Sequence, residues 1–120
     1  MNPRETILVA SWDPTLADVR KRALESAGFE VLQSKGAAQV HEICTKRKVN
    51  LVLIGYSLPP AEKRRIWEEA RKTCKTPILE MYPSGGKPEL MESTALFSHE
   101  AFAPDDFVSR VQSILKNKAN

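Results

Sequence analysis

Short runs of apolar residues alternate with longer amphipathic segments along the chain. The short runs predict five strands, at 6–11, 29–34, 51–55, 76–82 and 96–100. Apolar residues at helical spacing predict helices at 13–28, 36–47, 61–74 and 103–117. Asp13 suits the N-cap of the first helix, Pro14 its first turn and Gly28 its end, while Pro104 suits the start of the last helix. A glycine- and proline-rich loop at 83–88 and a short helix at 89–95 complete the predicted elements.

Strands that alternate with helices indicate an α/β fold with a parallel sheet covered on both faces. Right-handed crossovers then give a doubly wound arrangement of five strands. The 120 residues suit one domain with one core, so we expect a single domain over 1–120.

Composition and charge exclude few functions. No apolar stretch approaches the roughly 20 residues of a membrane span, and the first residues do not resemble a secretion signal, so we expect a cytoplasmic protein without membrane contact. The formal charge of +3 does not require nucleic acid, because the basic residues of 63–72 interleave with glutamates. Cys44 and Cys74 lack metal-site spacing, and we expect both to be reduced and structural.

Four stretches resemble, in order, the receiver domain of bacterial response regulators. They are "ILVASWDP", "LVLIGYSLPP", "TPILEMYP" and "FSHEAFAPDDF", and the resemblance covers nearly the whole chain. It implies the flavodoxin-like (CheY-like) sheet with strand order 2-1-3-4-5. The segment before Phe97 is shorter than usual, which implies that the family's fourth helix is shortened or absent.

The resemblance also implies where phosphorylation chemistry would reside, and there the chain departs from the family. Ser11 and Trp12 occupy the positions of two acids that hold Mg²⁺, a cation that prefers oxygen ligands. Gly55 replaces the aspartate that accepts the phosphoryl group, Tyr82 replaces a Ser or Thr, and Glu100 replaces the charge-neutralising lysine. We call these five positions the acceptor corner. They predict a degenerate pseudo-receiver with no metal, no cofactor and no phosphorylation in the family's manner.

Two uses of the acceptor corner remain open. In the first, Trp12 and Tyr82 fill the space that acid, metal and phosphate once used, and the corner is structural packing. In the second, Ser11, Tyr82 and Glu100 bind a small polar ligand, and the protein is a ligand sensor. A hydrolase is not expected, because His99 and Glu100 are neighbours on a strand and point to opposite faces.

We therefore expect a non-enzymatic signalling module that works through protein contacts. By the resemblance, its contact face combines the family's fourth helix, fifth strand and fifth helix, and the residues assigned to it are Phe97, His99, Phe107 and Arg110. The expected partner is a sensor kinase or an output protein. A homodimer through the same face is the alternative.

Overall fold

The computed structural model describes residues 4–55, 57–82, 95–98 and 104–118. Strands and helices alternate from the start of this region. The elements are β1 (Thr6–Ala10), α1 (Pro14–Ser26), β2 (Glu30–Ser34), α2 (Ala37–Lys46), β3 (Leu51–Ile54), α3 (Pro60–Glu69), a π-helix η1 (Ala70–Cys74), β4 (Ile78–Tyr82), β5 (Ala95–Ser98) and α4 (Pro104–Lys118). The α/β class predicted from the hydrophobic pattern is confirmed.

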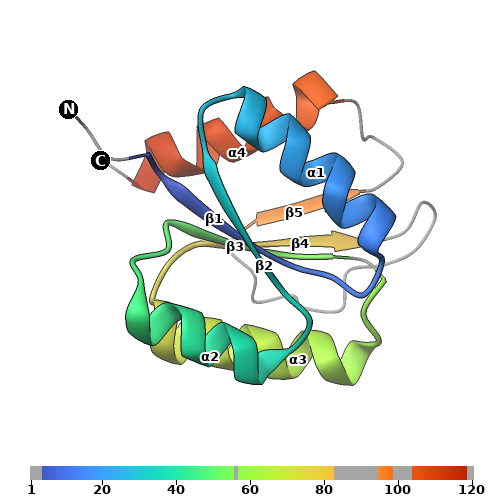
Figure 1. Cartoon of the computed structure of the whole chain (residues 1–120), viewed down its shortest axis with the longest axis vertical. Helices are drawn as coiled ribbons and strands as arrows, with labels where there is room; N and C mark the ends of the chain where they lie inside the picture. Colours follow the sequence, from blue (N-terminus) through green and yellow to red (C-terminus); the bar gives the residue numbers. More distant parts are fainter. Residues whose placement is uncertain (1–3, 56, 83–94, 99–103, 119–120) are drawn as a thin grey trace.

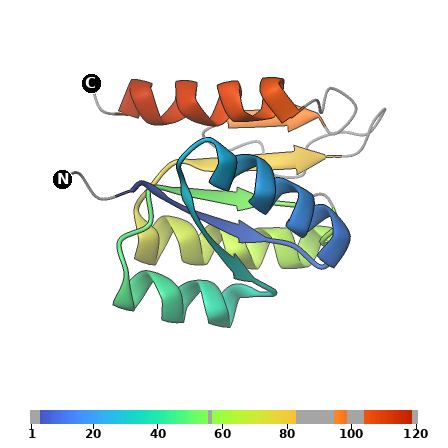
Figure 2. The ribbon, with the colours of Figure 1, turned by 45° about the horizontal axis from the view of Figure 1, so that its top comes forward.

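The five strands form one parallel sheet with the order β2-β1-β3-β4-β5, as predicted. Ala10 at the end of β1 pairs with Ile54 at the end of β3, so both strands reach the carboxyl edge of the sheet together. Helices α1 and α4 cover one face, and α2 and α3 cover the other (Figure 1). Figure 2 shows that α1 begins at the carboxyl end of β1 and runs back along the sheet.

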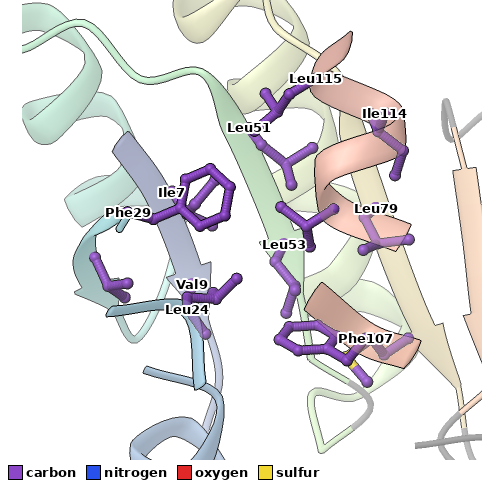
Figure 3. Packing of buried hydrophobic residues seen from close by; sticks show 13 residues of the cluster. Ile7, Val9, Leu24, Phe29, Leu51, Leu53, Leu79, Phe107, Ile114 and Leu115 are labelled. Carbon is purple, nitrogen blue, oxygen red and sulfur yellow. The ribbon is translucent and has the colours of Figure 1, made fainter. Parts of the chain in front are cut away.

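Alternate strand residues feed two separate hydrophobic clusters, one on each face. Ile7 and Val9 of β1 pack into the cluster beneath α1 and α4, while Leu8 and Ala10 pack beneath α2 and α3. Figure 3 shows the first cluster, in which Phe107 of α4 lies against the central strands. Burial on both faces explains why the strand sequences read as unbroken apolar runs.

Two features of the helices differ from the simple pattern. The predicted helix at 61–74 is α-helical only to Glu69 and continues as the π-helix η1, which ends at Lys75 in the left-handed conformation (φ 53°). Val19 of α1 lies at helical spacing from the apolar residues Leu16 and Ala23, which predicts an inward position, yet it is 42% exposed, and Arg20 beside it is 1% exposed. The predicted helix at 89–95 lies almost wholly outside the described residues, so the shortened fourth helix stays a prediction. The last helix of the chain is the one labelled α4.

Candidate functional site

The acceptor corner is built on the adjoining ends of β1 and β3. The residues that follow the paired ends are Ser11 and Gly55, and the Gly55 amide donates a hydrogen bond of 2.8 Å to the Ala10 carbonyl. Ligands of doubly wound sheets bind outside the carboxyl ends of such strands. The topology thus brings Ser11 and Gly55 together at the edge of the sheet where the resemblance to receiver domains predicts the phosphorylation site.

Gly55 is crowded by its neighbours. A Cβ atom at this position would lie 3.0 Å from Nη1 of Arg20, 3.1 Å from the Ala10 carbonyl oxygen and 3.2 Å from the Ser11 Cβ. The φ angle of Gly55 is not in the left-handed region, so the backbone itself does not require glycine here. Close approach of the guanidinium and the β1 backbone is therefore the reason that a side chain fits poorly.

Arg20 reaches the corner because of the direction in which α1 runs. Asp13 caps the helix by accepting hydrogen bonds from the amides of Thr15 (3.0 Å) and Leu16 (3.1 Å), as the sequence predicted. Helical side chains tilt toward the N-terminus, and the N-terminus of α1 lies at the carboxyl edge of the sheet. A long side chain on the buried face of α1 therefore points at Gly55.

Sequence reasoning missed Arg20, although a signal was present. Ala17, Arg20 and Leu24 are the buried residues of α1, at positions i, i+3 and i+7 of one helix face. Apolar spacing alone favours Val19, one residue away, because arginine is almost never fully buried unless it is paired. A buried guanidinium now occupies the side of Gly55 on which an acceptor carboxylate would need space.

Ser11 is 8% exposed, and its hydroxyl group joins two loops of the corner. Its Oγ lies 3.2 Å from Oγ of Ser57, which in turn accepts a 3.1 Å hydrogen bond from the Trp12 amide. The Asp13 amide donates to the Ser11 Oγ at 3.1 Å. Ser57 was not identified from the sequence. The two hydroxyl groups are used in holding the loops after β1 and β3 together.

Trp12 does not fill the corner, and that prediction was wrong. Its side chain is 51% exposed, and its indole Nε1 donates a 2.6 Å hydrogen bond to the carbonyl of Lys35, just after β2. Consecutive residues leaving a strand point in opposite directions, so when Ser11 turns inward Trp12 turns toward solvent. Arg20, rather than an aromatic ring, is the large side chain next to Gly55.

The other residues assigned from the sequence fall in three groups. Tyr82 ends β4 and is half-buried, two residues beyond the Ile54–Glu80 pair. Phe97 pairs with Met81 in β5, while His99 and Glu100 lie outside the described residues. Arg110 is exposed on α4.

Phe107 requires a correction to the predicted contact face. It is fully buried in the first core cluster, so it cannot be part of an accessible surface. It lies at an inward position of α4, packed against the sheet with Val111, one turn further along the helix. Phe107 can affect the contact face only indirectly, by packing α4 against the sheet.

The described residues of the acceptor corner do not fit Mg²⁺. The ion would need anionic oxygen ligands, but Ser11 contributes a hydroxyl group already bonded to Ser57 and to the Asp13 amide, and the Asp13 carboxylate caps α1. The guanidinium of Arg20 beside Gly55 adds a positive charge that would repel a cation. No phosphoryl-transfer step can therefore be derived through a metal at these residues.

A buried ion pair lies between β4 and α3, on the face of the sheet that α2 and α3 cover. Nζ of Lys63 (α3) is 3.0 Å from Oε2 of Glu80 and 2.9 Å from the Met81 carbonyl oxygen, and both side chains are almost completely buried. The sequence did not reveal this pair, because Lys63 was counted among surface charges. This buried ion pair joins α3 to β4 and so holds the helix against the sheet.

The cysteines also differ from the prediction. Cys44 and Cys74 form a disulfide, with Cα atoms 5.1 Å apart, instead of two reduced thiols. The cause is the doubly wound topology, which places α2 and the end of α3 side by side on one face although the two cysteines are 30 residues apart. The spacing in the sequence could not show this proximity.

Polar groups flank the disulfide. Nδ1 of His41 (α2) lies 2.8 Å from Oε2 of Glu69, and the Thr73 hydroxyl donates to the same oxygen. The hydrogen bond from Thr73, and then the one from His41, lower the pKa of Glu69 below its usual value. This cluster is a cross-helix contact rather than a catalytic arrangement, since the carboxylate bridges the other two groups.

A polar hollow of about 730 Å³ lies at the amino edge of the sheet, far from the acceptor corner. Its lining includes Arg4, Thr6 and Asn50, together with the ion pair between Arg47 and Glu30. It therefore does not provide the corner with space for a ligand.

No protein-family model matches the chain. The phosphate regulon transcriptional regulatory protein PhoB of Pseudomonas aeruginosa is 24% identical to it over 119 residues. The match covers 93% of this chain and 52% of PhoB, so the chain spans about half the length of that relative.

The backbone of this chain also superposes on solved structures of receiver domains. A CheY-like response regulator receiver domain protein from Methanospirillum hungatei superposes with a TM-score of 0.83 at 20% identity, over 98% of each chain. The chemotaxis protein CheY4 of Vibrio cholerae gives 0.80 at 16% identity, over 93% of this chain and 99% of its own. The fold is that of a response-regulator receiver domain.

Other receiver folds agree with this assignment. The signal receiver domain of an HD domain-containing protein from Pseudomonas fluorescens gives a TM-score of 0.80 at 13% identity, over 98% of each chain. Among the described residues, no helix is long and apolar enough to cross a membrane. The receiver fold predicted from four short stretches is confirmed.

Proposed function

We propose that this chain is a receiver-fold module of two-component signalling that acts through protein contacts and is not phosphorylated in the manner of response regulators. The observation that carries the proposal is the guanidinium of Arg20 against Gly55, 3.0 Å from where a Cβ would lie. The position that would bear the nucleophile has no side chain, and a buried cation occupies its surroundings.

The electrostatics of the corner support the same proposal. Phosphoryl transfer to a carboxylate in a receiver needs a nucleophile and a metal held by acids. Here the acids are replaced by Ser11 and Trp12, and the hydroxyl group of Ser11 is engaged with Ser57. The ligand-sensor alternative needs free space at this corner, which the crowding of Gly55 argues against.

Acetyl phosphate with millimolar Mg²⁺, followed by intact mass spectrometry, tests the proposal. We expect no gain of a phosphoryl group by the native chain. Gly55→Asp alone should also gain none, because the new carboxylate would pair with Arg20 and the metal acids would still be missing. A hydroxylamine-labile phosphoryl adduct on the native chain would overturn the proposal.

Protein contacts are tested by capture with the exposed face of α4. Arg110→Glu should weaken capture of a sensor kinase or output protein, whereas Arg22→Glu, whose side chain is 79% exposed on α1, is the matched charge-reversal control. Light scattering of both variants reports whether the partner is a second copy of the chain. Equal capture by both variants would place the contact elsewhere.

A further inference from the structure

We infer that the Cys44–Cys74 disulfide is a reversible, redox-sensitive tie between α2 and the π-helical end of α3. The bond joins two neighbouring elements on one face of the sheet, with Cα atoms 5.1 Å apart, a separation that disulfides ordinarily span. It lies at the C-terminal ends of both helices, which is the amino edge of the sheet. The inference is therefore independent of the acceptor corner and of the proposed function.

The tie joins α2 and η1 at the margin of the interface that packs them together. Cys44 and Cys74 are only partly buried and lie at the border of the second core cluster. Among the described residues, His41 of α2 also reaches Glu69 and Thr73 across this interface, and its side chain is partly exposed. The π-helical geometry of η1 widens the helix at the point where Cys74 meets Cys44.

Partial exposure gives small thiols and disulfides access to the pair. Lys46 and Arg47, which follow Cys44, are paired with Glu42 and Glu30, so their charge does not draw an anionic thiol to the bond. Access rests on the partial exposure of Cys44 and Cys74 themselves. The pair is thus placed for exchange with the cellular thiol pool rather than sealed in the core.

Formation of the bond follows thiol–disulfide exchange. One cysteine thiolate attacks a low-molecular-weight disulfide, forms a mixed disulfide and releases one small thiolate. The second cysteine thiolate then attacks the protein sulfur of that mixed disulfide and releases the second small thiolate. The two protein thiols lose two electrons and two protons in total, and the small disulfide is reduced to two thiols.

Opening the bond releases a closed segment of chain that contains β3 and α3. The oxidised state restricts the unfolded chain and holds α2 against η1, whereas reduction leaves only the packing and the polar contacts. We expect reduction to lower the melting temperature by about 10 °C. Amide hydrogen exchange should accelerate more in α2 and η1 than in α1 and α4.

The test equilibrates the native chain in glutathione buffers that range from fully reduced to fully oxidised. Free thiols are then trapped with a maleimide and counted by mass. We expect no trapped thiol in the oxidising buffers, two in the reducing buffers and a single transition between them. The melting temperature and the exchange of α2 and η1 should follow the same transition.

Cys44→Ser and Cys74→Ser are the matched controls, and each should melt like the reduced native chain in every buffer. If either variant fails to fold, the native chain alone still carries the test. A bond that persists in excess reduced glutathione would overturn the inference, because the tie would then be permanent. Stable glutathione adducts without the internal bond, or equal acceleration of exchange in all four helices, would overturn it as well.

Discussion

Gly55→Ala is the change that most directly tests whether the acceptor corner is closed. The new Cβ would meet three atoms at 3.0–3.2 Å, one of them the rigid Ala10 carbonyl oxygen. Carbon contacts in protein interiors are optimal at about 3.5–4.0 Å. The substitution therefore forces Arg20 or the β1 backbone to move.

The magnitude follows from two opposing effects. Overpacking a well-packed site costs about 1–3 kcal/mol. Replacing glycine at an ordinary φ returns about 0.4–1 kcal/mol by restricting the unfolded chain. We expect a net loss of about 1–2 kcal/mol, and for a domain of this size each kcal/mol lowers the melting temperature by about 4 °C.

Urea and thermal unfolding followed by circular dichroism measure this loss. The control is the same substitution in an Arg20→Met background, where the 3.0 Å contact with the guanidinium is absent. Gly55→Ala should cost less there, and the double-mutant cycle gives the coupling between the two sites. If Gly55→Ala were neutral or stabilising in the native background, the corner would be open, and the ligand-sensor alternative would regain support.

Three further results are expected. Glu80→Leu should cost about 3–5 kcal/mol by leaving the Lys63 ammonium buried beside a single carbonyl, and adding Lys63→Met should recover most of this loss; full stability of Glu80→Leu would refute the pair's importance. In a Trp67→Phe background, Trp12 should emit like a water-exposed indole, unchanged by Mg²⁺, and blue-shifted emission would restore the packed-corner prediction. The pKa of Glu69 is lower in the folded protein than its usual value of 4.5, so the ionised carboxylate stabilises the fold at pH values above 4.5. This stabilisation is lost as the pH falls through the lowered pKa. The gap in melting temperature between the native chain and Glu69→Gln should therefore narrow as the pH falls below about 5, and a gap independent of pH would contradict the assignment.

Much of the fold follows from local patterns in the sequence. Unbroken apolar runs such as Leu51–Ile54 arise because each strand is buried on both faces. Asp13 and Pro14 fix the start of α1, because the Asp13 side chain accepts hydrogen bonds from free amides of the first turn and Pro14 has no amide hydrogen that needs a partner. The missing carboxylate at Gly55 is also a fact of the sequence alone. These features depend on neighbours along the chain, so they could be predicted without the tertiary structure.

The contents of the acceptor corner and the state of the cysteines were decided by the tertiary structure. Arg20 meets Gly55 only because α1 runs back from the carboxyl edge and its long side chains tilt toward that edge. The indole of Trp12 meets the Lys35 carbonyl because β1 and β2 are neighbours in the sheet, which places the loops after them side by side. Cys44 meets Cys74 because two crossovers place their helices on the same face. Each of these contacts joins residues far apart in the sequence, where periodicity carries no information about distance.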